Sequence, residues 1–273
     1  MIISTSCINE MPTRMAPPHF SPAVELPIFV ISLRRSTERR ALMVQQFARL
    51  NLPFSFFDAI DAQQCEHPLQ RHYRAQHSLL RKGRPLSAGE VACYASHYQL
   101  WQWCVDHQQA VIIMEDDIAL NPHFPQARAS VSAQIESLGY IRLARTFEVK
   151  KQPLTPIDER YTLYKYFGKP SGAQCYALHP SAARKLLRHS RRISLPVDDF
   201  MDQEWRHGVA AIGVEPMPIT ITDLPSEIGQ RRPEQPLSRV NRINREAFRC
   251  GYDLMGSLFN LHFRLRQKWR HKR

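Results

Sequence analysis

The stretch that decides the fold is Ala110–Leu120, AVIIMEDDIAL. Its apolar run, Val111–Met114, leads directly into three consecutive acids, Glu115, Asp116 and Asp117. A short apolar run predicts a buried strand, and open α/β sheets bind their ligands at the carboxyl ends of strands. Adjacent carboxylates repel one another unless a cation joins them, so the stretch indicates a divalent metal site. The alternative is a solvated acidic turn after a core strand.

The segments before this strand predict a strand–helix–strand unit. Pro27–Leu33, PIFVISL, is the first predicted strand, and a helix beginning near Ser36 follows it. Phe54–Ile60, FSFFDAI, is the second predicted strand, so the order implies a parallel sheet. Arginines crowd the first strand-to-helix junction, where free backbone N–H groups and guanidinium donors suit phosphate, although they can equally be solvated. These are Arg34, Arg35, Arg39 and Arg40.

A capped helix is predicted to lead into the acidic strand. Ser87 is followed three residues later by Glu90, which is the spacing of a capping box. The helix then continues through His97 and Trp101 and ends near Asp106. Glu90 can act as a cap alone, and a histidine on an aromatic helix face is typical of a satisfied core residue.

The second half of the chain predicts further strands and helices. A helix over Phe124–Leu138 is closed by Gly139, and Asp198 and Asp199 lie at the start of a later helix. Acids there favour the helix dipole, which explains them without function. The functional alternative is a carboxylate that accepts a proton from a substrate hydroxyl. Strands are predicted at 140–143, 171–178 and 209–214, with irregular or hairpin structure between 146 and 170.

Positive charge is concentrated at the end of the chain. The 273 residues carry a net charge of +12, of which residues 238–273 carry +8 and the other 237 residues +4. The end segment combines arginines with Leu and Phe at helical spacing, which predicts a basic amphipathic helical tail of the type that lies on anionic membranes. A terminal helix packed on the domain is the alternative. Nucleic acid is a weaker candidate partner because no recognition motif is present.

Composition and cysteine spacing set the remaining expectations. The six cysteines are scattered without a CxxC pair, which favours free thiols in a reducing compartment over a zinc or redox site. No stretch reaches the ~18 apolar residues of a membrane span, and residues 1–24 lack the apolar segment of a signal peptide. We therefore expect a flexible lead-in over residues 1–25, one globular domain over 26–237 and the basic tail over 238–273.

Seven segments in order resemble glycosyltransferase family 25, which includes bacterial lipooligosaccharide and collagen galactosyltransferases. Each segment is weak alone, but the set in this order is specific. The chain departs from the family at Ser32, where the family usually has Asn, and at Ala173–Cys175, where Thr-His is frequent. The segments are Ile28–Arg39, Phe57–Asp61, Leu86–Trp101, Ile112–Asp117, Gly172–Leu187, Pro196–Asp198 and Ser226–Gly229.

The resemblance implies a GT-A-like, nucleotide-sugar-binding α/β domain with a mainly parallel central sheet flanked by helices. It also implies inverting transfer of a hexose, most often galactose from UDP-galactose, to a saccharide acceptor. A Mn²⁺ or Mg²⁺ ion would neutralise the diphosphate of the leaving UDP. Asp117 is the first choice of metal ligand, and Glu115 or Asp116 would contribute to the metal or the ribose.

The resemblance also implies roles for the remaining candidate site residues. Asp198 is the leading candidate for the base, with Asp199 as the neighbour that could replace it. Arg35 and Arg39 would hold the nucleotide phosphates or support the first loop. The residues expected to line or brace the donor site are Glu90, Ser96 and His97.

The sequence therefore predicts an enzyme of lipopolysaccharide, lipooligosaccharide or related envelope-glycan synthesis. It would act on a lipid-linked or oligosaccharide acceptor at the inner face of the cytoplasmic membrane, held there by the basic tail. The competing hypotheses are a basic nucleic-acid-binding protein and a relative that binds a nucleotide sugar without turnover.

Overall fold

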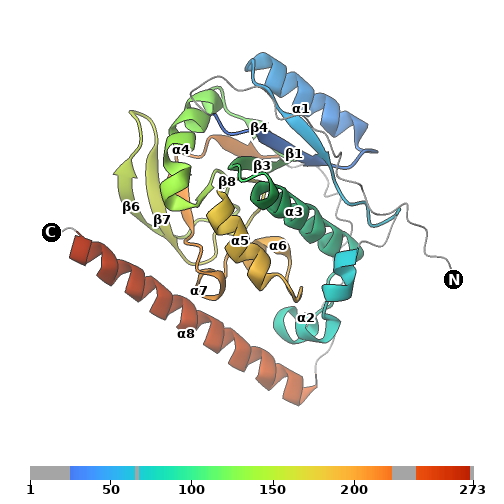
Figure 1. Cartoon of the computed structure of the whole chain (residues 1–273). Helices are drawn as coiled ribbons and strands as arrows, with labels where there is room; N and C mark the ends of the chain where they lie inside the picture. The colour runs from blue at the N-terminus through green and yellow to red at the C-terminus, as the bar shows by residue number, and fades with distance from the viewer. Residues whose placement is uncertain (1–24, 65–67, 223–237, 271–273) are drawn as a thin grey trace.

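A computed structural model describes residues 25–64, 68–222 and 238–270 of the chain. Its centre is an eight-stranded sheet with the strand order β2-β1-β3-β8-β5-β9-β7-β6 (Figure 1). A second, two-stranded sheet pairs β4 (Ile118–Leu120) with β10 (Ile219–Ile221). The strands of the main sheet are β1 (Ile28–Ser32), β2 (Ser55–Asp58), β3 (Val111–Glu115), β5 (Tyr140–Arg142), β6 (Lys150–Pro156), β7 (Thr162–Phe167), β8 (Cys175–Leu178) and β9 (Ile212–Glu215).

The main sheet is mixed, so the prediction of a mainly parallel sheet is wrong. Only the neighbouring pairs β1–β2, β1–β3 and β5–β9 are parallel; the other four are antiparallel. Strands β8 and β7 run against the rest, and each lies between two strands of the other direction. Parallel neighbours need a long crossover, and the chain supplies no helix between β5 and β8, where residues 150–167 form a β-hairpin.

Helices cover both faces of this sheet. Alternate residues of the buried strands point to opposite faces, so Val111 and Ile113 join one apolar cluster while Ile112 and Met114 join the other. The first cluster packs against α3 (Ala88–Asp106), α5 (Pro180–His189) and α6 (Val197–Met201), and the second against α1 (Thr37–Arg49) and α4 (Phe124–Leu138). The short elements η2 (Pro68–His72), α2 (Ala75–Lys82) and α7 (Glu204–His207) connect these layers.

Local capping signals in the sequence are confirmed. At the start of α3, Ser87 Oγ accepts from the Glu90 N–H at 3.1 Å and the Glu90 carboxylate accepts from the Ser87 N–H at 2.8 Å. Helix α4 ends at Gly139, whose φ of +77° is the left-handed conformation that a helix C-terminus favours and glycine adopts easily. The four cysteines in the described part of the chain are free, as expected.

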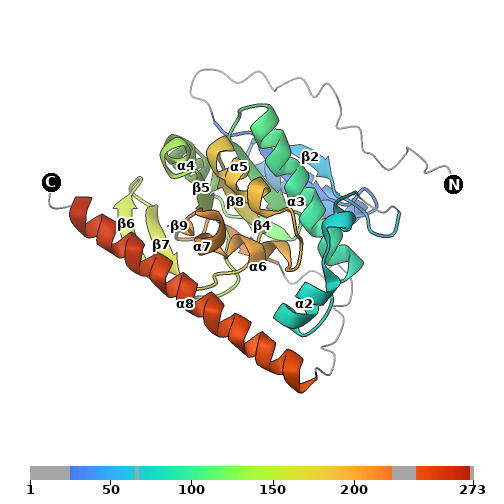
Figure 2. The same cartoon turned by 60° about the horizontal axis from the view of Figure 1, so that its bottom comes forward.

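The basic segment forms one long helix, α8 (Arg239–Arg270), which crosses the underside of the domain from α2 toward the β6–β7 hairpin (Figures 1 and 2). Its inner side is attached by specific contacts: the Tyr252 hydroxyl donates to the Asp202 carbonyl at 3.1 Å, and Arg81 lies 4.5 Å from the centre of the Phe248 ring. Helix α8 is therefore packed on the domain. Among the described residues, no helix is both long and apolar enough to cross a membrane. The lead-in over residues 1–24 and the motif at 226–229 lie outside the described residues.

Candidate functional site

A cavity of about 300 Å³ lies where the three parallel strands β1, β2 and β3 end. The strand ends bring together Leu33, Asp61 and the acidic run after Met114, and the first turns of α3 close the opposite side. Parallel strands place their carboxyl ends at one edge of the sheet, which explains why residues so far apart in sequence meet here. The predicted site residues among its lining are Arg35, Arg39, Ser96, Glu115, Asp116 and Asp117.

Asp116 is the best-held acid of the three. Its side chain is buried, with a relative exposure of 8%. One oxygen accepts from the Arg39 guanidinium at 2.7 Å and the other from the Ser32 hydroxyl at 2.6 Å. Ser32 thus makes a direct contact at the position where the chain departs from the family pattern. The protein itself therefore neutralises the charge of Asp116 and supplies a hydrogen-bond donor to each of its carboxylate oxygens.

Asp117 is held in the opposite way. Its Oδ1 is buried and forms no hydrogen bond with any described residue. Burial, followed by the neighbouring charge of Glu115, raises the pKa of the Asp117 carboxyl to about 7. A carboxylate that is costly to ionise in isolation becomes favourable when a cation binds beside it. The orphaned oxygen and the second acid next to it fit a hard divalent ion.

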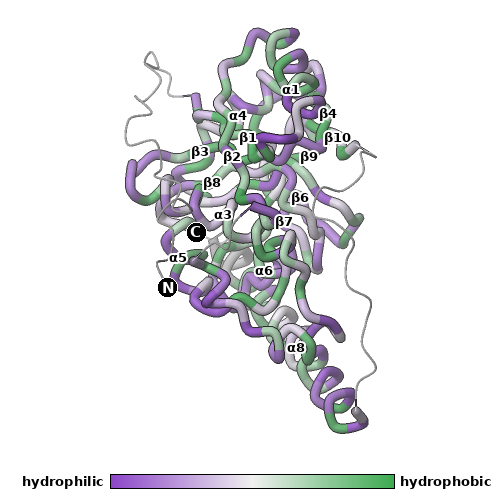
Figure 3. Tube along the Cα trace, turned by 90° about the vertical axis from the view of Figure 1, so that its right-hand side faces the viewer, coloured by the Kyte–Doolittle hydropathy of each residue, from purple (hydrophilic) through white to green (hydrophobic). Residues whose placement is uncertain are grey.

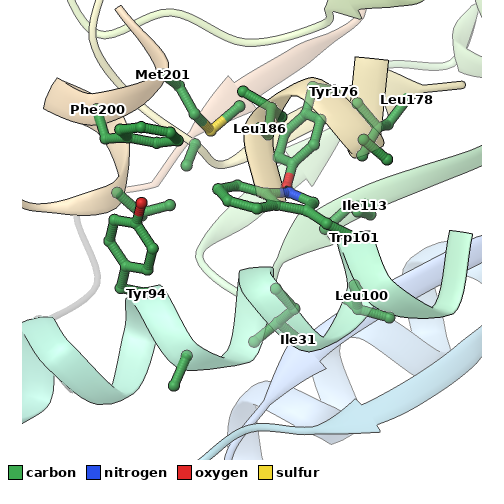
Figure 4. Close-up of a cluster of buried hydrophobic side chains, with 14 of the residues drawn as sticks. Ile31, Tyr94, Leu100, Trp101, Ile113, Tyr176, Leu178, Leu186, Phe200 and Met201 are labelled. Atoms are coloured by element: carbon green, nitrogen blue, oxygen red, sulfur yellow. The ribbon is translucent and has the colours of Figure 1, made fainter. Parts of the chain in front are cut away.

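Glu115 ends a chain of hydrogen bonds through the core. Figure 4 shows the first two members, with the ring nitrogen of Trp101 beside the hydroxyl oxygen of Tyr176 among buried hydrophobic side chains. The Trp101 indole N–H can only donate, and it lies 2.8 Å from the Tyr176 oxygen. The Tyr176 hydroxyl lies 2.8 Å from His97 Nδ1, and His97 Nε2 lies 3.2 Å from the Glu115 carboxylate. If Tyr176 accepts from Trp101 and donates to Nδ1, every group is satisfied, and the proton of a neutral His97 lies on Nε2, directed at Glu115.

Cys93, His97 and Glu115 also offer one ligand atom each within 4.8 Å of one another. Burial and the charge of Glu115 raise the pKa of the Cys93 thiol well above its ordinary value, so it stays protonated. His97 Nε2 carries a hydrogen in the arrangement above. Because Mn²⁺ and Mg²⁺ prefer hard oxygen ligands to sulfur, the oxygen pair of Glu115 and Asp117 is the better candidate for such an ion.

Three other predicted residues support the walls of the cavity. Arg35 donates to Asp61 at 2.9 Å, which fixes the loop after β2. The Ser96 hydroxyl accepts from the Ile60 N–H at 2.9 Å, so it attaches α3 to the same loop. Glu90 is buried away from the cavity lining, where it caps α3 and accepts two hydrogen bonds from Arg84, at 2.7 and 2.6 Å.

Asp198 and Asp199 both lie in the first turn of α6, but they face different groups. Asp199 is paired with Lys82 at 2.6 Å. Asp198 accepts from the Ser171 hydroxyl at 2.9 Å, and its charge helps to raise the pKa of Cys93 in the cavity wall. Of the two acids, Asp198 is thus the one that forms no ion pair with a cation of the described residues.

A buried network that sequence reasoning missed positions Asp198. Arg142 forms a 2.6 Å ion pair with Asp202 and donates to the carbonyl oxygens of Ser171 and Gly172 at 2.9 and 2.6 Å. Asp202 in turn accepts from the Ser171 N–H at 3.0 Å. Ser171 is held at φ +53°, a conformation that favours glycine, so the network fixes a strained turn.

Little in the sequence marked these residues. Arg142, Ser171 and Asp202 belong to no short motif and meet only through the sheet. Tyr176 lies in a segment that resembles the family, and Trp101 lies on the predicted capped helix, but the sequence alone assigns neither residue to the site.

Comparison with known proteins identifies the family. The family model described as "Glycosyltransferase family 25 (LPS biosynthesis protein)" matches residues 25–201. A "Glycosyltransferase 25 family member" of Anopheles gambiae is 29% identical over 184 residues, covering 64% of this chain and 31% of that protein. The "Lipooligosaccharide biosynthesis protein lic2B" of Haemophilus influenzae is 30% identical over 176 residues, covering 59% of this chain and 62% of that protein.

Several relatives are named as inactive members of the family. The human "Inactive glycosyltransferase 25 family member 3" is 30% identical over 192 residues, which is 64% of this chain and 31% of that protein. The chain thus aligns with only about a third of the length of the mosquito and human relatives. The family match nevertheless includes β1 to α6, with the whole acidic run and Asp198. On this match, the chain belongs to glycosyltransferase family 25.

Proposed function

We propose that this protein transfers a hexose from a nucleotide sugar, with UDP-galactose as the expected donor, to a saccharide of lipopolysaccharide or a related envelope glycan. The observation that carries the proposal is Asp117, a half-buried acid whose buried Oδ1 has no hydrogen-bond partner among the described residues, beside Glu115 in a cavity at the strand ends. Family membership supports the reaction class. The name of the Haemophilus influenzae relative concerns lipooligosaccharide biosynthesis and supports the acceptor class.

The two less constrained acids would hold the cation. Asp117 and Glu115 present hard oxygen ligands, which Mn²⁺ and Mg²⁺ prefer, while Asp116 is already bound to Arg39 and Ser32. When bound, the cation supplies the positive charge that lets a diphosphate leave. Arg35 and Arg39 line this cavity, here called the donor cavity, and their guanidinium groups would orient the donor phosphates.

Asp198 is the proposed proton acceptor for the attacking hydroxyl. Inversion by direct displacement needs one base on the acceptor side, and Asp199 is engaged by Lys82. The contact from Ser171 and the network around Arg142 fix the Asp198 carboxylate. These contacts favour Asp198 over its neighbour.

Helix α8 is the proposed membrane contact at the inner face of the cytoplasmic membrane. Its outward face carries apolar side chains at spacings of three, four and eleven residues, which return to one side of a helix, and their exposed fractions range from 47 to 68%. These residues, here called the outer stripe, are Val240, Ile243, Leu254, Leu258, Leu261 and Leu265. Figure 3 shows hydrophobic and hydrophilic residues alternating along α8. Arginines accompany the stripe, and this combination suits an anionic bilayer surface.

The experiment is a panel of UDP-sugars offered to the wild type and to Asp117→Asn, with Mn²⁺ or with EDTA, and with a truncated lipooligosaccharide as acceptor. We expect turnover of one donor that requires Mn²⁺ and falls at least a hundredfold in the variant. The variant should also lose the rise in melting temperature that Mn²⁺ gives the wild type. Metal-independent turnover, or an unchanged Asp117→Asn, would refute the metal assignment.

A non-catalytic, donor-binding role is the second candidate, because several relatives are named inactive. Calorimetry separates the two. Tight binding of a UDP-sugar without turnover on any acceptor favours the binding role, while turnover excludes it.

A further inference from the structure

A second, strongly basic cavity lies between α2, α6 and α8. It has a volume of about 190 Å³ and is here called the basic pocket. Among the described residues, its lining includes four cationic side chains and one carboxylate, together with the ring of Tyr252. One of the cations, Arg249, also forms a 3.2 Å ion pair with Glu246, which lies outside the lining. The charged groups are Arg81, Lys82, Lys169, Arg249 and Asp199. Such a pocket fits an anionic ligand better than a neutral one.

Arg81 is the cation whose charge is least compensated. It donates to the Ser194 hydroxyl at 2.6 Å and lies over the Phe248 ring, but no carboxylate of the described residues forms an ion pair with it. Burial, followed by the charge of Arg206, lowers the pKa of Arg81, so the protein offers it repulsion rather than attraction. A bound anion would remove this cost, because it supplies the missing opposite charge.

The other cations differ in how firmly they are held. Lys82 forms the 2.6 Å ion pair with Asp199, which is the one acid among the described lining residues. Lys169 Nζ lies 3.9 Å from the centre of the Tyr252 ring and 4.0 Å from an Asp253 oxygen, and its side chain is half exposed. Lys169 therefore lines the pocket, and its ion pair with Asp253 is a long one.

The position of the pocket relates it to the proposed reaction. Asp199 lines the pocket, and Asp198, the proposed base, is the next residue along α6. The pocket and the proposed base thus share the first turn of α6. Helix α8 contributes Phe248, Arg249 and Tyr252, so the pocket is complete only when α8 is packed on the domain.

We propose that the basic pocket binds a phosphate group on the acceptor, which makes the acceptor a phosphorylated saccharide. The assignment rests on the proposed function and adds the chemical class of the second substrate. A phosphate accepts several charge-assisted hydrogen bonds at once, which matches the guanidinium of Arg81 and the ammonium group of Lys169.

The test is calorimetric binding of glucose 6-phosphate, with glucose as the uncharged control, to protein saturated with UDP and Mn²⁺. We expect binding of the phosphate sugar alone, weakened at least tenfold by Arg81→Gln and by Lys169→Gln. Lys150→Gln, which removes an exposed charge on β6, should change nothing. Circular dichroism reports whether Arg81→Gln still folds. Because the Lys169 side chain is half exposed, Lys169→Gln should leave the stability of the fold unchanged. Equal affinity in the pocket variants and wild type, or no binding at all, would overturn the proposal.

A second arm separates the acceptor from the lipid headgroup as the source of phosphate. Vesicles of phosphatidylglycerol and phosphatidylcholine are offered to the same variants. Loss of vesicle binding while glucose 6-phosphate binding persists would overturn the acceptor assignment. Titration with UDP in the absence of the sugar phosphate tests the donor cavity by itself. Absence of UDP binding would count against the proposed function, whereas UDP binding without glucose 6-phosphate binding would count against the basic pocket alone.

Discussion

At the scale of single residues, the site depends on the direction of a few hydrogen bonds. A buried hydroxyl is best satisfied when it accepts one bond and donates another, which for Tyr176 means accepting from Trp101 and donating to His97 Nδ1. The consequence is a fixed histidine tautomer whose N–H points at Glu115, 3.2 Å away. Four side chains from α3, β3 and β8 thus act as one unit behind the acids.

The variant Tyr176→Phe tests this unit. It keeps the ring and its packing but leaves a buried indole N–H and His97 Nδ1 without their partner, which costs about 1–3 kcal/mol of unfolding free energy. We also expect slower transfer, because the His97 tautomer and its contact with Glu115 are no longer enforced. Urea denaturation and steady-state kinetics measure the two effects.

The matched control is Tyr98→Phe, one helical turn from Trp101. No hydrogen bond is made by the Tyr98 hydroxyl to the described residues, so neither stability nor transfer should change by more than experimental scatter. A Tyr176→Phe protein as stable and as fast as this control would show that the chain of hydrogen bonds has no role.

At the scale of elements, the start of α3 combines a cap with a buried ion pair. Ser87→Ala removes one side-chain cap and should cost about 1 kcal/mol. Glu90→Ala removes the cap and also leaves Arg84, which is 8% exposed, without its carboxylate, so it should cost about 3–5 kcal/mol. Thermal or urea unfolding of both variants shows which substitution lowers the free energy of unfolding more. Equal costs would mean that Glu90 acts as a cap alone.

Elements with local signals were predictable and those set by distant pairing were not. The sequence identified α3 from its capping box, α4 from Gly139, and β3 from its apolar run. The direction of β8 depends on pairing with both β3 and β5, and no residue of Cys175–Leu178 encodes it. The error of a mainly parallel sheet comes from extending the first strand–helix–strand unit to the whole chain.

The site was predictable to a similar extent. Acids and arginines that follow strands were found because they occur in short runs, and the structure gathers them at one cavity. The contacts that define Asp198, Asp199 and Glu115 come from Ser171, Lys82 and His97, and the Lys82–Asp199 pair joins residues that are 117 positions apart. Such partners can be found only from the three-dimensional structure.

At the scale of the whole molecule, acid stability should depend on His207. Burial lowers the pKa of His207 to about 3, and its neutral ring accepts from the Val209 N–H and donates to the Phe200 carbonyl. Below pH 6.5, His207 is protonated in the unfolded chain but stays neutral in the folded protein. The free energy of unfolding therefore falls by about 1.4 kcal/mol per pH unit as the pH decreases toward 3.

Comparison with His207→Gln isolates this effect. Burial raises the pKa of Asp202 to about 6, so the Asp202 contribution has the opposite sign, being lost as pH rises from 3.8 to 6. The amide keeps both hydrogen-bonding roles and does not titrate. Between pH 6.5 and 4.5, the wild type should lose about 2 kcal/mol relative to the variant in urea denaturation. Parallel pH profiles would contradict the assignment.

The arrangement of α8 decides how the molecule meets a membrane. Deleting residues 238–273 would remove the outer stripe, but it would also uncover the surface under Phe248 and Tyr252 and open the basic pocket. Substitutions on the outward face are therefore the sharper test. We expect Leu254→Ser, Leu258→Ser and Leu261→Ser together to weaken binding to phosphatidylglycerol vesicles more than tenfold, since each leucine contributes about 1.5–3 kcal/mol when fully buried.

Leu42→Ser with Val44→Ser is the matched control, because these α1 residues are also about half exposed (45% and 49%) but lie away from α8. Vesicle binding should persist in the control, and donor turnover should persist in both proteins, since neither set touches the donor cavity. If the wild type sediments as a dimer and the leucine variant as a monomer, the stripe joins two copies of the chain, and the membrane assignment fails. Retained vesicle binding in a monomeric leucine variant would move the contact to the arginines alone, which high salt would then abolish.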